Sequence, residues 1–541
     1  MIRAAIIKLY KTVHTWTGIT CGFALFIAFY AGALTMFMEP IARWASPPAV
    51  GSAAVPLQDA PALIGKVLAA YPEAAEELRV ELRGTENVPA RVTWHQHPLG
   101  PDGKPDHSRE AHWWASLEAD GTLRVEQQEP SELGRFINEI HMRVGIPGRW
   151  GMNFMGVVTL LYGVALVSGV IVLLPSLVKD FFALRVGHNL KRMWLDAHNV
   201  VGITGLPFHV VMAVTGMTFS FGLLFFGVQG KVIYGDRMKI VSQRFSAQFQ
   251  PPKPTGEAAP MLAPLVLLER LKEQAPEFDA HALTLHNAGD KAAGAEFSGT
   301  EPGYVMDTTY AEIMLSAVTG EVVNDLRPSR QDPWWRGTMT LAGLHFGQYG
   351  GAIVRWSYFL LGLAGAWLFY GGNLLWLETR RKTRRKGSDE SPVQRRDAYW
   401  LAAGTVGVCL GCVAGLSLTI VAAKWLHGRV DNLDHWHEVV YYAVFFASIA
   451  WAFARGAARS SIELLWLCAV VTLAIPLTTL AAWLLPALGM WAHGSAATIG
   501  VDVVAFAGAL CFAWIARATA RRMRHGPADS VWSLPRVHST R

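Results

Sequence analysis

Two histidines stand at the head of long apolar runs, each within the same short pattern. The copies read His14-Thr-Trp-Thr-Gly18-Ile19 and His198-Asn-Val-Val-Gly202-Ile203, and each has a further glycine eighteen residues after its histidine, Gly32 or Gly216. A histidine in a membrane helix is costly to bury without a partner, and glycines on the same helix leave room for a flat, bulky group. The pair therefore predicts one part of a haem-binding scaffold.

Two more histidines occupy corresponding places further along the chain. His141 and His345 each precede an apolar run and an Arg-Trp pair, Arg149-Trp150 and Arg355-Trp356. The order of histidine helix, long polar loop and histidine helix occurs twice, which indicates an internal repeat and a pseudo-twofold four-helix unit. Histidines from facing helices can supply both axial ligands of a b-type haem. A single membrane histidine is more often a hydrogen-bonded interfacial residue, but four at repeated positions favour ligation.

The composition indicates an all-α polytopic membrane protein. The 541 residues are 52% hydrophobic and 17% charged, and the mean hydropathy is +0.25. Runs of about 20 apolar residues span a bilayer. Eight such runs predict about eight transmembrane helices, at 15–38, 152–175, 199–228, 343–377, 399–424, 437–454, 462–485 and 497–516.

The distribution of basic residues predicts the orientation of these helices. Lys and Arg concentrate in alternate connections, most strongly in Arg380-Arg-Lys-Thr-Arg-Arg-Lys386, which places both termini in the cytoplasm and the loops 39–140 and 229–340 outside. His14 and His198 then lie near the inner face, and His141 and His345 near the outer face, giving one bis-histidine haem site in each leaflet. The pI of about 9.0 thus reports membrane topology, and we expect no nucleic-acid partner.

The two outer loops are expected to be α+β. Helices are predicted at 57–78 and 262–274, and strands at 91–95, 111–117 and 122–126, the last two joined by an Asp120-Gly121 turn. A strand–turn–strand follows at 313–324. The predicted domains are a core at 1–380, a basic cytoplasmic linker at 381–398, an appended four-helix membrane domain at 399–516 and a cytoplasmic tail at 517–541.

Other residues are secondary candidates. His209 follows His198 by three helical turns and could replace a ligand, lie between the haems, or be a polar residue packed beside Pro207. Haem propionates would need cations, for which the candidates are Arg149, Arg355, Lys11, Lys191 and Arg192; simple interfacial snorkelling is the alternative. Trp334-Trp335-Arg336 is a candidate substrate platform, although anchoring at the membrane interface is the more usual role of such tryptophans. A weaker candidate for ligation is Asp434-His435-Trp-His437-Glu438.

The sequence has no G-x-G-x-x-G after a strand and no Walker motif. We therefore expect the electron donor to be a separate reductase or a membrane quinol.

Several of these motifs, taken together, resemble the PepSY-associated transmembrane family over about residues 1–380. They are the His14 opening, Ile140-His141, Asp196-Ala-His198-x3-Gly202, Leu344-His345-Phe-Gly and Val318–Asn324. The family includes iron-regulated inner-membrane proteins of Gram-negative bacteria, some of which are haem-containing reductases of ferric siderophores. The resemblance implies an inner-membrane location, PepSY-like periplasmic loops, a ferric-siderophore or other Fe(III)-chelate substrate, and haem ligation by histidines 14, 141, 198 and 345.

The resulting hypothesis is a diheme b-type reductase that passes electrons across the inner membrane and releases Fe(II) from a periplasmic chelate. Two other classes stay open. A transporter or permease subunit for iron or siderophore fits the repeat topology equally well and predicts no haem. A non-enzymatic PepSY-type binding or regulatory membrane protein predicts full function without the histidines.

Overall fold

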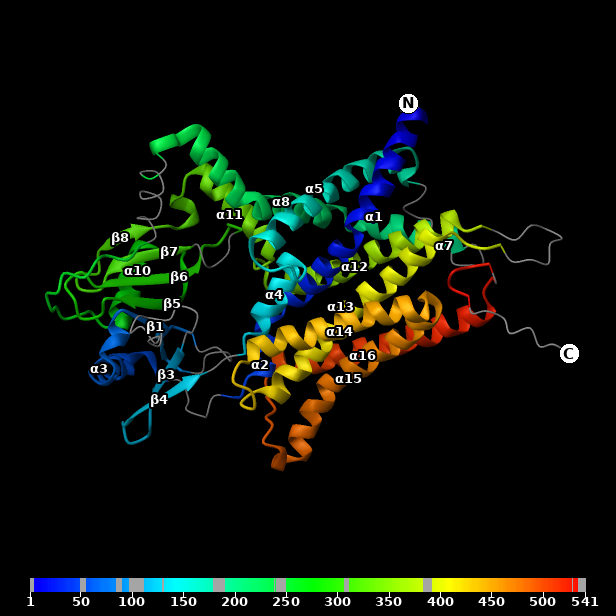
Figure 1. Ribbon diagram of the computed structural model, residues 1–541. Helices are drawn as coiled ribbons and strands as arrows, with labels where there is room; N and C mark the ends of the chain where they lie inside the picture. Colours follow the sequence, from blue (N-terminus) through cyan, green and yellow to red (C-terminus); the bar gives the residue numbers. More distant parts are fainter. Residues whose placement is uncertain are drawn as a thin grey trace. The chain divides into compact units, whose positions relative to one another are not determined.

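The computed structural model of the chain is mostly helical and contains one antiparallel sheet (Figure 1). It divides into two compact units. The first comprises residues 1–48, 131–223 and 355–541, and the second comprises residues 49–130 and 224–354. The structure describes residues 4–48, 55–83, 90–96, 111–128, 131–178, 190–237, 239, 250–305, 311–382, 392–527 and 529–533.

The apolar runs form helices long enough to cross a membrane. Among the described residues there are seven such helices, or eight with a bent pair counted as one span, which confirms the expected number. The seven are α1 (Ala4–Thr35), α5 (Gly148–Leu173), α12 (Gly351–Arg380), α13 (Arg396–Leu426), α14 (Leu433–Arg455), α15 (Ala457–Leu484) and α16 (Ala496–His525). The chain is a membrane protein.

The third predicted run differs from expectation because it is a broken helix. It consists of α7 (Leu190–Thr204) and α8 (Leu206–Gln229), whose axes are bent by 69° between Lys191–Thr204 and Leu206–Gly222. Gly205 lies at the break and Pro207 follows it. Proline has no backbone N–H and its ring disturbs the preceding turn, while glycine, without a side chain, allows the backbone to bend. His198 and His209 therefore lie on two differently directed helices.

Helices α1, α5, α7–α8 and α12 pack side by side through small residues. A methyl group on Gly362 of α12 would lie 3.0 Å from Cβ of Ala33 on α1. A methyl group on Gly156 of α5 would lie 2.6 Å from the ring of Phe221 on α8. Helix α1 also packs on α5, and Gly202 of α7 faces Leu368 of α12. The predicted four-helix core is thus present.

Helices α13–α16 belong to the same compact unit as these four helices (Figure 1). Helix α13 packs on α14 and α15, and also on α1. Asn373 of α12 is 2% exposed and donates a hydrogen bond of 3.2 Å to Oγ1 of Thr405 on α13. Helix α16 continues to His525, so it includes the first residues of the predicted tail.

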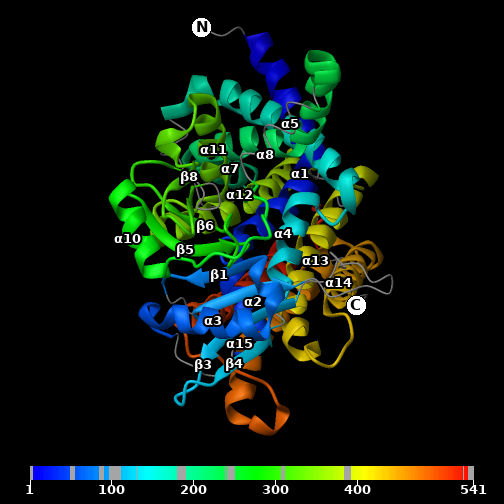
Figure 2. The ribbon, with the colours of Figure 1, turned by 90° about the vertical axis from the view of Figure 1, so that its left-hand side faces the viewer.

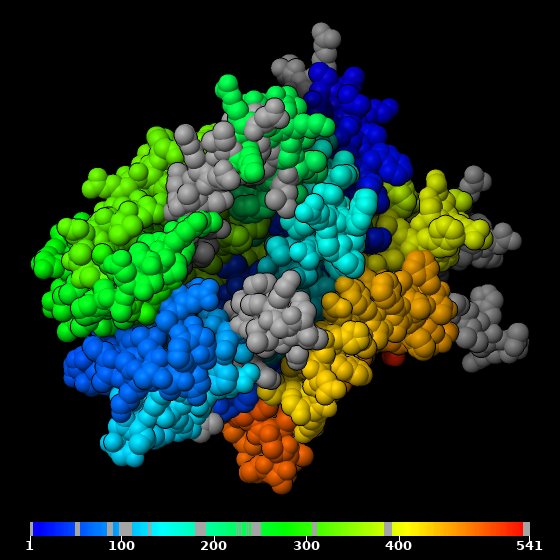
Figure 3. All heavy atoms as spheres, turned by 60° about the vertical axis from the view of Figure 1, so that its left-hand side comes forward, coloured from blue at the N-terminus to red at the C-terminus, as the bar shows by residue number. Residues whose placement is uncertain are grey.

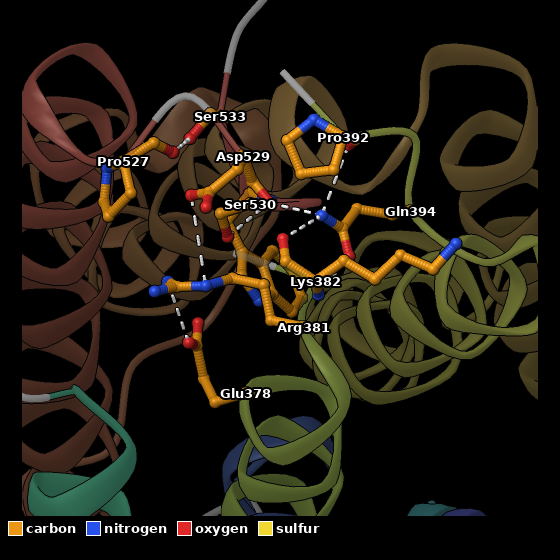
Figure 4. Close-up of polar contacts among 10 residues, drawn as sticks. Glu378, Arg381, Lys382, Pro392, Gln394, Pro527, Asp529, Ser530 and Ser533 are labelled. Atoms are coloured by element: carbon orange, nitrogen blue, oxygen red, sulfur yellow. Dashed lines mark hydrogen bonds and ion pairs between the residues drawn. The ribbon is translucent and has the colours of Figure 1, made fainter. Parts of the chain in front are cut away.

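A polar cluster joins the end of α12 to the residues before α13 and after α16 (Figure 4). Nε2 of Gln394 donates to the carbonyls of Lys382, at 2.9 Å, and Asp529, at 2.6 Å, and Oε1 of Gln394 accepts from the Lys382 N–H at 3.0 Å. Arg381 lies 3.1 Å from the buried Glu378 carboxylate and 4.0 Å from Asp529. Because most partners are backbone groups, we assign this cluster a structural role: it connects the ends of these helices. Residues 383–391 of the predicted basic linker lie outside the described residues.

Three short helices precede or follow spans: α2 (Met38–Ala45), α4 (Leu133–Arg143) and α11 (Pro333–Phe346). His141 and His345 were expected at the mouths of spanning helices. They lie instead near the ends of α4 and α11, which are separate from α5 and α12. Helices α4 and α11 each end in a left-handed residue, Val144 or Gly347, which stops the helix and redirects the chain.

The second unit is built on one antiparallel sheet with the order β4-β3-β2-β1-β5-β6-β7-β8 (Figure 2). Both long loops contribute, because β1 from the first pairs with β5 from the second, with Leu78 opposite Leu285. The strands are β1 (Glu77–Glu81), β2 (Val92–Gln96), β3 (Ala111–Leu117), β4 (Leu123–Gln128), β5 (Asp279–His286), β6 (Gly294–Thr300), β7 (Glu312–Ser316) and β8 (Val322–Asp325).

Helices α3 (Ala60–Ala70) and α10 (Pro264–Gln274) cover one face of this sheet. Leu63 and Leu267, both fully buried, pack there with strand residues such as Leu78 and Phe297. In Figure 3 the blue and cyan residues of the first loop adjoin the green residues of the second. The remaining short helical turns are 57–59, 72–75, 174–176, 230–234, 235–237, 328–330 and 486–488.

The predicted loop elements are largely confirmed. Strands β2, β3, β4, β7 and β8 and helix α10 lie where expected, and Gly121 turns the β3–β4 hairpin with a φ of 83°. The predicted helix 57–78 was too long. It ends at Ala70, before Pro72, and Leu78 and Val80 then alternate as buried residues of β1. Strands β1, β5 and β6 were not predicted.

Candidate functional site

His14 lies on α1 with its imidazole held by a neighbouring helix. Its Nδ1 lies 2.8 Å from the backbone carbonyl of Ala165 on α5. A carbonyl only accepts, so Nδ1 carries the proton and Nε2 keeps its lone pair. A methyl group on Gly169 would lie 2.9 Å from Cε1 of His14, so the absence of a side chain there makes room for the ring. This is the arrangement in which a histidine is oriented as a metal ligand.

His198 on α7 faces this imidazole. The two ring centroids lie 6.2 Å apart, with the ring planes at 76°. Two imidazoles that share one metal through bonds of about 2 Å have their centroids about 6 Å apart. Nδ1 of His198 is buried and makes no hydrogen bond of normal geometry with the described residues, and the ring interacts with the backbone of Leu368 on α12. The spacing of the two rings fits a ligand pair around one metal centre.

His141 on α4 is held in the same way as His14. Its Nδ1 lies 2.7 Å from the carbonyl of Ala28 on α1, which leaves the lone pair on Nε2. A methyl group on Gly32 would lie 2.6 Å from Nδ1 of His141, so the repeated glycine does leave room for a flat ring. Burial lowers the pKa of His141 from its ordinary value, which favours the neutral imidazole that binds metals.

These histidines define two levels along α1. Ala28, which contacts His141, follows His14 by fourteen residues, which is about 21 Å of helix. His345 lies on α11 in the second unit, so its pairing with His141 stays a prediction. The structure brings His14 together with His198 and places His141 near the other end of the same helix.

His209 lies between the two levels. It is 2% exposed, and its Nδ1 is 2.7 Å from the Tyr162 hydroxyl on α5. On α12, Gly365 faces His209 and Gly372 faces His198, and seven helical residues separate them by about 10 Å. The imidazole is surrounded by aromatic rings, which are those of Phe29, Tyr162 and Phe208. This position is a separate level from the His14–His198 pair.

The cations predicted for propionates have different surroundings. Lys11, Lys191, Arg149 and Arg355 are exposed. Nε of Arg192 lies 3.2 Å from the carboxylate of Asp196, which is 1% exposed and lies one turn along α7. Arg192 is therefore already engaged in an ion pair with a buried carboxylate.

The predicted substrate platform forms the first turn of α11. The backbone N–H groups of Trp334 and Trp335 donate to the capping carboxylate of Asp332 at 2.9 and 3.0 Å. Trp334 is 84% exposed, and Arg336 is half-buried. The other end of α11 carries His345. The arrangement accords with either a platform or an interface anchor.

Sequence reasoning missed the groups that hold the histidines. These are the carbonyls of Ala28 and Ala165, the space at Gly169 and the hydroxyl of Tyr162. Backbone acceptors leave no signal in residue type, although Gly169 and Tyr162 lie in an apolar run where either could have been noticed. No group of three or more His, Cys, Asp or Glu side chains arranged to hold a metal ion occurs in the described part of the chain, including the 434–438 segment.

Comparison with known proteins identifies the family to which the chain belongs. The family model described as the PepSY-associated TM region matches residues 11–379. An uncharacterized protein of Pseudomonas aeruginosa is 28% identical over 369 residues, which cover 64% of this chain and 87% of that protein. Helices α13–α16 lie beyond the end of the family match. The chain belongs to the family of proteins that carry the PepSY-associated transmembrane region.

Proposed function

We propose that this protein is a haem-dependent oxidoreductase that carries electrons across the bacterial inner membrane to an Fe(III) chelate. The observation that carries the proposal is the His14–His198 pair. His14 is fixed in the tautomer that leaves Nε2 available, and His198 lies across from it at 6.2 Å between ring centroids. The imidazole of His198 also interacts with the backbone of Leu368 on α12, and such contacts orient a histidine ligand.

The residues of this pair fit the axial ligands of a b-type haem. Haem bound there would supply one-electron transfer, and its potential would depend on ligation and burial. The chain contributes the rest. The Ala165 carbonyl raises the basicity of His14 and fixes its orientation. The absence of a side chain at Gly169 leaves the space that the ring occupies.

A second haem is proposed at the other level, with His141 and His345 as ligands. Support comes from the surroundings of His141, which are like those of His14: the Ala28 carbonyl fixes its ring, and Gly32 leaves room for it. The basic connections favour cytoplasmic termini and periplasmic long loops. His14 and His198 would then receive electrons near the cytoplasm, and His141 and His345 would release them at the outer face.

The proposed substrate is a ferric siderophore or another Fe(III) chelate. Oxygen-rich ferric chelators bind Fe(II) weakly, so reduction releases the metal. Trp334, Trp335 and Arg336 at the start of α11 are the proposed contacts for such a bulky ligand. Because the sequence has no nucleotide-binding motif, the proposed donor is a quinol or a separate reductase.

The test is the absorption spectrum of the purified full-length protein from haem-replete cells. We expect reducible b-type Soret and α bands, and loss of one haem in the His14→Ala variant. The control is His525→Ala, which removes an exposed histidine at the end of α16, outside the repeat, and should retain both haems. A wild-type protein without reducible bands would contradict the proposal and leave a transporter subunit or a PepSY-type regulatory protein as the reading.

A further inference from the structure

The helix that carries His141 rests on a helix that the family match does not include. Helix α4 packs on α14. Nη2 of Arg135 on α4 lies 3.3 Å from the Asp434 carboxylate on α14. The ring of Phe136 contacts two buried residues of α14, with centroids 5.7 Å from Tyr441 and 6.0 Å from His437. The contact therefore combines an ion pair with a packed aromatic patch.

A second contact fixes the turn immediately after His141. Val144 has a φ of 47° and Gly145 a φ of 82°. The left-handed conformation is unfavourable for a residue with a side chain, and a β-branched residue is held there only by the structure around it. The hydroxyl of Tyr442 on α14 donates to the Gly145 carbonyl at 2.7 Å. A methyl group on Gly145 would lie 3.1 Å from Cε1 of Tyr442, so the ring and the turn are in close contact.

Helix α2 forms a second support for α4 and is itself held by the C-terminal helices. A methyl group on Gly134 of α4 would lie 3.2 Å from the Met38 carbonyl on α2. Nε1 of Trp44 on α2 lies 3.0 Å from Thr479 of α15 and 3.0 Å from Asp502 of α16. Nζ of Lys424 on α13 is 4.2 Å from the centroid of the Trp44 ring. All four C-terminal helices thus contact α4 or its neighbour α2.

We propose that α13–α16 form a positioning domain for His141. In this arrangement Tyr442 fixes the Val144–Gly145 turn, the Arg135–Asp434 pair fixes the other end of α4, and the imidazole is held against Ala28 between them. Tyr442 is a positioning residue because it acts through α4 and touches no ligand atom. The inference rests on the proposed function and deepens it, since it assigns the residues that set the properties of the His141 haem.

The test compares two substitutions at Tyr442 in the full-length protein. Tyr442→Phe removes the hydrogen bond and keeps the ring, and Tyr442→Leu removes both. The control Trp425→Phe deletes one hydrogen bond of 3.0 Å, from α13 to Thr478 on α15, and leaves the contacts between α4 and α14 in place. The readouts are redox titration and low-temperature electron paramagnetic resonance of the two haems, with amide hydrogen exchange of residues 133–143.

We expect one haem signal and its reduction wave to shift in Tyr442→Leu, with a smaller shift in Tyr442→Phe and none in Trp425→Phe. The affected signal should be the one lost in His141→Ala, and exchange of residues 133–143 should be faster. Two haems with unchanged signals in both Tyr442 variants would overturn the inference while leaving the proposed function intact. A wild-type protein without haem would instead overturn both.

Discussion

The two halves of the repeat hold their histidines differently. In the first half, His14 and His141 each direct Nδ1 to a backbone carbonyl of a neighbouring helix and lie against a glycine, Gly169 or Gly32. In the second half, Nδ1 of His198 makes no hydrogen bond of normal geometry, its ring interacts with the backbone of Leu368, and a methyl group on Gly372 would lie 3.6 Å from Cε1. The second half also has a broken helix, and its additional His209 is bonded to a tyrosine.

This difference separates what the duplication preserves from what it does not. The order of elements is kept, with a histidine on a span and a histidine on the short helix before the next span. The groups that orient the rings are specific to each half. We infer that His14 and His141 are oriented more tightly than His198 before any ligand binds.

The largest effect should come from removing one ligand of the facing pair. His198→Ala is expected to lose one of two haems, because no described histidine other than His198 lies across from His14 at ligand spacing. His209→Ala should keep both, since His209 lies about 10 Å away along α12. Haem quantified against protein by pyridine haemochrome distinguishes the two. Equal loss in both variants would show that His209 is a ligand.

A smaller effect is expected from filling the space beside the preoriented rings. Gly32→Ala places a methyl group 2.6 Å from His141, and Gly169→Ala places one 2.9 Å from His14, so each ring must move. We expect a several-fold lower haem occupancy at the affected level only. Gly500→Ala on α16, outside the repeat, is the control, because nothing lies within 4 Å of the added atom. Normal spectra in the two test variants would indicate that ring position matters little.

Substitutions at the C-terminal ends of α4 and α11 should change the stability of the protein in opposite directions. Val144 and Gly347 both adopt the left-handed conformation. Val144→Gly should stabilise the protein by about 1 kcal/mol, and Gly347→Ala should destabilise it by about the same amount. Thermal unfolding in detergent measures both. A lower melting temperature for Val144→Gly would mean that the valine side chain contributes more packing than its backbone conformation costs.

The smallest expected effect concerns a carboxyl on β7 in the second half. Burial, and then the neighbouring Glu296, raise the pKa of Glu312 from 4.5 to about 7. A raised folded-state pKa contributes stability that is fully present below the unfolded value and is lost as pH rises through about 7. Glu312→Gln should therefore raise the melting temperature at pH 8 and have little effect at pH 4. An equal gain at both pH values would assign the effect to packing.

Sequence reasoning recovered what depends on residue type and period. The spans, the Asp120-Gly121 hairpin, α10 and the repeated histidines all leave such a signal. It missed the break at Gly205 because a long apolar run hides a bend, even with Pro207 nearby. It also missed β5 and β6. Long-range pairing with β1, absent from any local pattern, completes the sheet in which they lie.

The β1–β5 pair has a consequence for how the chain is made. It joins residues about 200 apart in sequence, and contacts of such long range form late. The two strands come from loops separated by α4, α5, α7 and α8. The first loop can fold its hairpin during synthesis, but its β1 edge stays unpaired until the second loop has been made. The sheet can therefore be completed only after both halves of the chain have been made and inserted.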